Sequence, residues 1–154
     1  MTDHIETLVL PNELLLGEVS ALLAEGKSVV LKTKGNSMLP LIRGDRDSVE
    51  LHLENSVREN DIVLAHLPGG QYVLHRVIAI DGENVTLMGD GNIRGTEHCR
   101  MGDICGTVLF VVREDDTRVD VRSDGAVRRA VIWRRLLPVR RYILGVYRRL
   151  MRVF

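Results

Sequence analysis

The chain has 154 residues, of which 45% are hydrophobic and 27% are charged. This length suits one domain with short extensions. The hydrophobic share is high enough to form a core, so the composition excludes a chain that is a disordered tail. The 21 basic and 21 acidic side chains balance, but nine arginines and no acidic residue lie in residues 126–154. The sequence therefore divides into an acidic body and a basic tail, and a protein that is basic throughout is excluded.

The two cysteines, Cys99 and Cys105, are too few for a disulfide-rich scaffold. No apolar run reaches the ~18 residues of a membrane span, and the first residues lack the basic and apolar stretches of a secretory signal. The histidines and cysteines lack metal-ligand spacing, so no metal or cofactor is expected. We expect a cytoplasmic protein.

In chain order, the apolar pattern first predicts a helix. Residues 11–25 carry leucine and valine at helical spacing, within an N-terminal segment over residues 1–27. Residues 28–122 show short alternating runs between glycine-rich turns, which predicts a β domain. Within it we expect a hairpin over residues 61–80, a glycine-rich polar loop over residues 89–102 and a long strand directly after that loop.

The basic tail, residues 126–154, predicts a helix that breaks at Pro138. One side of its second half is apolar, formed by Val139, Ile143, Val146, Tyr147, Leu150 and Phe154. The other side carries Arg141, Arg148, Arg149 and Arg152. Four partners remain open: the acidic body, an anionic inner membrane surface met through residues 139–154, a second copy of the chain, and a nucleic acid, which is the least favoured.

The segment from Lys34 to Asp45 reads KGNSMLPLIRGD and carries the strongest chemical signal. Ser37 follows a glycine turn just beyond a predicted strand. A nucleophilic serine needs an exposed hydroxyl and nearby backbone N–H groups that hold an oxyanion. Gly35 allows a tight bend before the serine, and Met38 offers an apolar anchor. A plain connection between two strands explains the same residues equally well.

A histidine within an apolar strand supplies a candidate base. In residues 72–78, YVLHRVI, alternation places His75 on one face between two valines. Imidazole exchanges a proton near neutral pH, and the Ser37 hydroxyl is one partner for a buried ring. Asp90, in the turn MGDGN, is a candidate to accept the other ring N–H and hold its tautomer. A satisfied core histidine and a simple turn are the plainer alternatives.

These segments, in this order and at these separations, resemble those of the type I signal peptidases and their LexA-like relatives. The shared pattern is Gly-x-Ser-Met-x-Pro followed by Gly-Asp, then Asp-Ile-Val, His-Arg-Val and Gly-Asp-x-Asn, over roughly residues 28–112. The resemblance implies a mainly β fold, a partly open barrel, with an N-terminal helix and a helical C-terminal extension added here. It also implies that Ser37 is the nucleophile and that Met38 and Pro40 belong to its motif.

Most of these relatives use a lysine base where this chain has His75. The resemblance is therefore closest to the Ser-His branch of archaea and the endoplasmic reticulum, which implies that Asp90 assists. Gly91 stands where that branch has asparagine, and Asn60 stands where it has glycine. Neither the transmembrane anchor of signal peptidases nor the DNA-binding domain of LexA is expected in residues 1–27.

The sequence thus predicts a serine endopeptidase in which Ser37 attacks a peptide or leader-peptide substrate, His75 accepts its proton and Asp90 assists. The expected oxyanion and substrate-binding residues are Gly35, Asn36, Met38 and Pro40. Two alternatives remain. One is a non-catalytic peptide-binding or dimerisation module of the same fold, and the other is a peripheral membrane factor that acts through its arginine tail.

Overall fold

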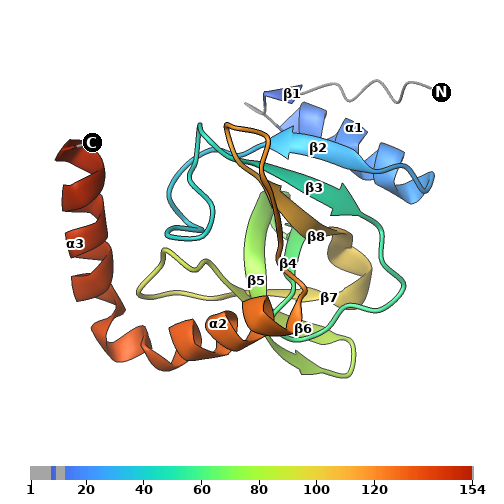
Figure 1. Ribbon diagram of the computed structural model, residues 1–154. Coiled ribbons are helices and arrows are strands. Elements are labelled where there is room, and N and C mark those ends of the chain that lie inside the picture. Colours follow the sequence, from blue (N-terminus) through green and yellow to red (C-terminus); the bar gives the residue numbers. More distant parts are fainter. Residues whose placement is uncertain (1–7, 10–12, 154) are drawn as a thin grey trace.

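The computed structural model describes residues 8–9 and 13–153 (Figure 1). Residues 1–7 and 10–12 of the predicted N-terminal segment, and Phe154, lie outside the described residues. The described chain begins with β1 (Leu8–Val9) and α1 (Glu13–Ala24). The helix expected near residues 11–25 is thus present, and it ends before Gly26, whose φ of +85° a glycine adopts without strain.

Apart from β7, the β-strands after α1 lie where alternation predicts them. The strands after α1 are β2 (Val29–Lys32), β3 (Ser48–His52), β4 (Ile62–His66), β5 (Tyr72–Asp81), β6 (Asn84–Met88), β7 (Glu97–Arg100), β8 (Ile104–Val112) and β9 (Arg118–Asp120). In the described chain they form one sheet of order β1-β2-β3-β8-β4-β5-β6-β7, with β9 paired to β8. The predicted hairpin over residues 61–80 is β4 and β5, whose register sets Val63 opposite His75.

The sheet curls into a half-barrel, with α1 covering the end that contains β2 and β3 (Figure 1). Val19 and Leu23 of α1 are fully buried against Leu51 and Val108 of the sheet. Each such side chain contributes about 1.5–3 kcal/mol by leaving water, so this layer stabilises the fold. A second apolar cluster, which includes Val77 of β5, fills the other half of the sheet. The predicted mainly β fold with a partly open barrel and terminal helices is confirmed.

One local expectation was wrong. The glycine-rich loop predicted for residues 89–102 contains the strand β7 and a short 3-10 helix, η1 (Met101–Asp103). Only Cys99 of β7 is buried, because β7 is the last strand of the sheet order and, within the described part of the chain, pairs with β6 alone. A single inward apolar residue gives too little alternation for a strand to be predicted. The missed strand sets Glu97 opposite Leu87 of β6.

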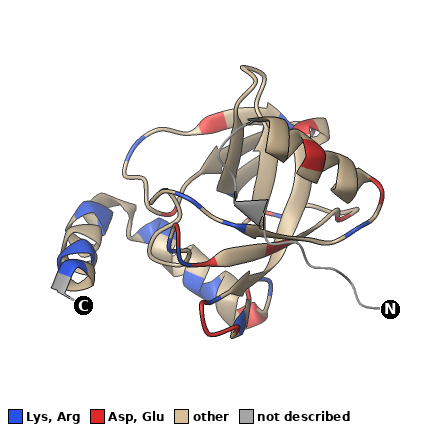
Figure 2. Ribbon diagram, turned by 90° about the horizontal axis from the view of Figure 1, so that it is seen from above, with Lys and Arg blue, Asp and Glu red and all other residues tan. Residues whose placement is uncertain are grey.

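The basic tail is helical, as expected, and changes direction at the proline. It forms α2 (Asp124–Arg135), a 3-10 turn η2 (Leu137–Val139) and α3 (Arg140–Val153). The side chain of Ser123 caps α2 by accepting from the Ala126 N–H at 3.2 Å. Seen from above, Lys and Arg colour both C-terminal helices, and α3 stands at the edge of the body (Figure 2). No helix within the described residues has the length and apolar character needed to cross a bilayer.

Candidate active site

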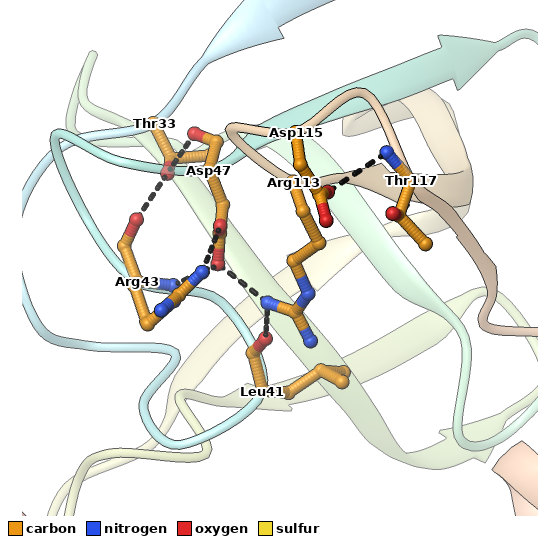
Figure 3. A network of polar contacts seen from close by, with 7 residues as sticks. All are labelled: Thr33, Leu41, Arg43, Asp47, Arg113, Asp115 and Thr117. Atoms are coloured by element: carbon orange, nitrogen blue, oxygen red, sulfur yellow. Dashed lines mark hydrogen bonds and ion pairs between the residues drawn. The ribbon is translucent and has the colours of Figure 1, made fainter.

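The serine loop, residues 33–47 between β2 and β3, is closed by the buried carboxylate of Asp47 (Figure 3). This carboxylate accepts hydrogen bonds from the backbone N–H of Arg43 at 2.8 Å and from the guanidinium of Arg113. Thr33 Oγ1 donates to the Asp47 carbonyl at 2.9 Å. The side-chain hydrogen bond to Asp47 raises the pKa of Arg43. Because a buried carboxylate is stable only when paired, the network fixes the second half of the loop.

The first half of the serine loop bends at a glycine. Gly35 has a φ of +76°, in the left-handed region. A Cβ on Gly44 would lie only 1.9 Å from the Gly35 carbonyl oxygen, so the two ends of the loop touch through their backbones. Between them Met38 is buried in the core, Asn36 is exposed and Ser37 is half-buried. The loop thus holds Ser37 at the surface on a buried methionine anchor.

The glycine-flanked turn after β6 packs directly against the serine loop. The Gly91 N–H donates to the Ser37 carbonyl at 2.8 Å. A Cβ on Gly91 would lie 2.1 Å from the Asn36 carbonyl oxygen, so glycine is required there. A Cβ on Gly89 would lie 2.4 Å from the Ser37 carbonyl oxygen and 3.1 Å from Nε2 of His75. The serine and histidine segments, distant in the chain, therefore meet around Gly89.

His75 of β5 is buried and contacts a carboxylate. Its Nδ1 lies 3.0 Å from Oε2 of Glu97, the first residue of β7. When Nδ1–H donates to this carboxylate, Nε2 carries the lone pair. Nε2 is the ring nitrogen beside Gly89, where a Cβ would contact both it and the Ser37 carbonyl oxygen. Both side chains belong to the described residues, and no hydrogen bond joins Ser37 Oγ to His75 there.

We expected Asp90 to contact His75, but its carboxylate contacts Arg76 instead. Both of its carboxylate oxygens accept from the guanidinium of Arg76, at 2.8 Å from Nε and 2.7 Å from Nη2. The Asp90 N–H points to the sulfur of Met38 at 3.4 Å, and its carbonyl accepts from Trp133 Nε1 at 2.8 Å. Adjacent residues of a strand point to opposite faces. A carboxylate turned towards Arg76 is therefore directed away from His75.

Glu97 is the site residue that the sequence reasoning missed. It lies in the segment predicted to be a loop, so its side chain was assigned no direction. A sequence signal was present: if residues 97–100 form a strand, Glu97 shares the face of the apolar residue Cys99. A charged residue on an inward face needs a partner, and His75 is that partner.

The model of one protein family, described as Peptidase S24-like, matches residues 2–109. The chain belongs to the Peptidase S24-like family. This places it in the superfamily of LexA-like and signal-peptidase-like proteins and points to a peptidase or a peptidase-like protein. The match includes Ser37, His75 and Glu97, whereas both C-terminal helices follow it. A comparison with curated proteins found no match.

In this S24-like chain a small pocket of about 70 Å³ lies beside Ser37. Its lining residues are Leu31, Thr33, Lys34, Gly35, Ser37, Met38, Ile42 and Leu74. Of the expected substrate-binding residues, Gly35 and Met38 thus line this pocket. Pro40 instead lines a larger one, of about 580 Å³, which Tyr147 of α3 also borders. The small pocket has room for one small side chain and is far below the 300–1,000 Å³ typical of small-molecule sites.

Lys34, a second basic side chain near the serine, is exposed. Across the described residues, no group of three or more His, Cys, Asp or Glu side chains is placed to hold a metal ion. The S24-like site therefore offers a serine, a histidine and a carboxylate as its chemical groups.

Proposed function

We propose that this S24-like chain is a serine endopeptidase in which Ser37 is the nucleophile and His75 the general base. One observation carries the proposal. Nδ1 of His75 lies 3.0 Å from Glu97, and its Nε2 and the Ser37 carbonyl oxygen both border the position that a Cβ on Gly89 would occupy. A carboxylate, an imidazole and a serine in this order form the arrangement used by serine hydrolases.

The reaction begins when Nε2 of His75 takes the proton of the Ser37 hydroxyl as Oγ attacks the peptide carbonyl. Hydrogen bonds of this kind are often loose without substrate and tighten when substrate binds. The resulting imidazolium is stabilised by the negative charge of Glu97. His75 then returns the proton to the leaving amine, and a water molecule, deprotonated by the same ring, hydrolyses the acyl-enzyme.

The developing oxyanion needs backbone donors. No hydrogen bond from the N–H of Ser37 is present among the described residues, so this donor is available at the reacting carbonyl. Asn36 and Gly35 precede it on a loop that the Asp47 network holds in place. Preorganised donors of this type contribute about 3–4 kcal/mol each to transition-state stabilisation.

Asp90 serves this mechanism as a positioning residue. Its ion pair with Arg76 holds the turn whose glycines contact Ser37 and His75. The substrate is an extended peptide, such as a leader peptide, with a small side chain in the pocket of about 70 Å³ beside Ser37. A site built for one small side chain rejects larger ones by overlap, which gives the enzyme its cleavage rule.

The test is cleavage of a library of extended peptides that vary the size of the residue before the scissile bond. Wild-type protein should cleave peptides with alanine, glycine or serine at that position, and Ser37→Ala should be inert. Ser56→Ala, which removes an exposed hydroxyl elsewhere, is the matched control and should retain full activity. Equal activity of wild type and Ser37→Ala would exclude the proposal. Peptide binding without cleavage by either protein would instead favour a non-catalytic peptide-binding module.

A further inference from the structure

Helix α3 has three distinct faces. One face packs on the body: Arg140 and Leu144 are 3% and 2% exposed, and Tyr147 is half-buried beside the pocket that Arg43 also lines. Arg140 donates to the Asn92 carbonyl at 3.0 Å and stacks over Trp133 at 5.1 Å. The helix is therefore fixed in orientation, and the direction of its other two faces is determined.

The second face is an exposed apolar row. Its members are Val139, just before the helix, and Tyr142, Ile143, Val146 and Leu150, which are 37–61% exposed. Their spacing of three and four residues places them along one side of a helix. An exposed row of this length is unusual, because single apolar side chains are normally scattered over a protein surface. Among residues 8–9 and 13–153, none covers this apolar row, so we look for its counterpart in an external partner.

The third face is basic. It carries Arg141, Arg148, Arg149 and Arg152, all of them exposed. None of these four arginines forms an ion pair within the described residues, and no acidic residue occurs in residues 126–154. In Figure 2 the Lys and Arg positions on the α3 ribbon lie apart from the Asp and Glu positions of the body. The basic face thus retains its full charge for an external partner.

We propose that the exposed apolar row and the basic face of α3 dock the protein on an anionic lipid bilayer. A helix that lies in the interface buries apolar side chains below the headgroups while its arginines meet lipid phosphates. Both exposed faces are then used at once. The acidic body is repelled by the same surface, so the protein binds with α3 towards the lipid.

The other candidate partners use only part of this surface. A second copy docked through the apolar row would bring two sets of four arginines together without an acidic residue between them. A nucleic acid would use the arginines and leave the apolar row in water. The bilayer also suits the position of the helix, because Tyr147 of α3 and Pro40 of the serine loop line the same pocket. Docking would hold the candidate active site close to the membrane surface.

The test is co-sedimentation of the full chain with vesicles of phosphatidylcholine alone or mixed with phosphatidylglycerol. Binding should be strong only with the anionic lipid and should weaken as salt is raised. The double variant Arg149→Gln/Arg152→Gln should bind about 25-fold more weakly, at about fivefold for each arginine near the surface. Val146→Ser/Leu150→Ser should lose at least about tenfold, because two buried side chains are removed from the lipid.

Two control variants make the same kinds of substitution on other helices. Arg128→Gln/Arg129→Gln removes equal charge from the exposed surface of α2, and Leu14→Ser removes an exposed leucine from α1. Both should bind like wild type. Equal losses in control and α3 variants, or no preference for anionic vesicles, would overturn the proposal. A dimer in lipid-free solution that Val146→Ser/Leu150→Ser dissociates, or binding to an oligonucleotide in place of vesicles, would overturn it as well.

Discussion

His75 and Glu97 meet across a strand that lies between them. Nδ1 of His75 on β5 is 3.0 Å from Oε2 of Glu97 on β7, and β6 separates the two strands in the sheet. Val77 of β5, Leu87 of β6 and Glu97 of β7 are register partners, so Glu97 and His75 share one face of the sheet. When Nδ1–H donates to this carboxylate, the lone pair is on Nε2, which lies beside the Gly89 turn that packs on the Ser37 segment.

Replacing Glu97 tests this orientation. Glu97→Gln keeps the shape but removes the charge that stabilises the imidazolium of His75, so kcat should fall about 100-fold or more with little change in KM. The control is Glu83→Gln, an exposed change in the turn before β6, which should leave peptide cleavage unchanged. Steady-state kinetics with a peptide that the wild type cleaves gives kcat and KM for each variant. Wild-type kcat in Glu97→Gln would show that His75 does not depend on this carboxylate.

Replacing Asp90 tests whether it holds the turn through Arg76 or orients the His75 ring. Asp90→Asn leaves the buried guanidinium of Arg76 without its counter-charge, and breaking a buried ion pair typically costs about 3–5 kcal/mol. Urea denaturation should therefore show a large loss of stability. An orienting contact to His75 would give the opposite pattern, a low kcat in a protein of unchanged stability, and that outcome would contradict the structural assignment.

The turn that contacts the serine loop should tolerate no side chain at Gly91. A Cβ there would lie 2.1 Å from the Asn36 carbonyl, so Gly91→Ala must displace backbone and should cost about 1–3 kcal/mol. Gly69→Ala is the matched control, since no atom lies within 4 Å of its Cβ position. Thermal unfolding of the two variants should differ clearly. Equal melting temperatures would mean that the turn and the serine loop are not packed together.

Stability at alkaline pH should depend on Cys99. Burial raises the pKa of the Cys99 thiol from 9.0 to about 11, with the charge of Asp103 as a lesser cause. Below pH 9 the thiol is protonated in both the folded and the unfolded chain. Between pH 9 and pH 11 the unfolded chain loses the proton while the folded chain keeps it, so the free energy of unfolding should fall by on the order of 2 kcal/mol.

Cys99→Ala isolates this effect from other groups that titrate at high pH. The difference in unfolding free energy between wild type and Cys99→Ala should shrink across this pH range, as measured by denaturant titrations at each pH. A constant difference would mean that the thiol titrates alike in both states.

Much of the fold could be read from the chain. The periodicity of α1, the hairpin of β4 and β5 and the break of the basic tail at Pro138 are local properties, and each appears where it was predicted. The strand β7 was missed because it has one buried residue, Cys99, and owes its conformation to pairing with β6. Pairing with a neighbouring strand leaves no periodic signal in a strand this short.

The candidate site divides in the same way. Residue types and their order singled out Ser37, His75 and the Gly-Asp-Gly turn, because a nucleophile, a base and a close backbone approach each demand particular side chains. Which carboxylate contacts the histidine was decided by the tertiary structure alone. Asp90 and Glu97 are chemically alike, and the curl of the sheet and the facing of each strand bring Glu97 to His75 and Asp90 to Arg76.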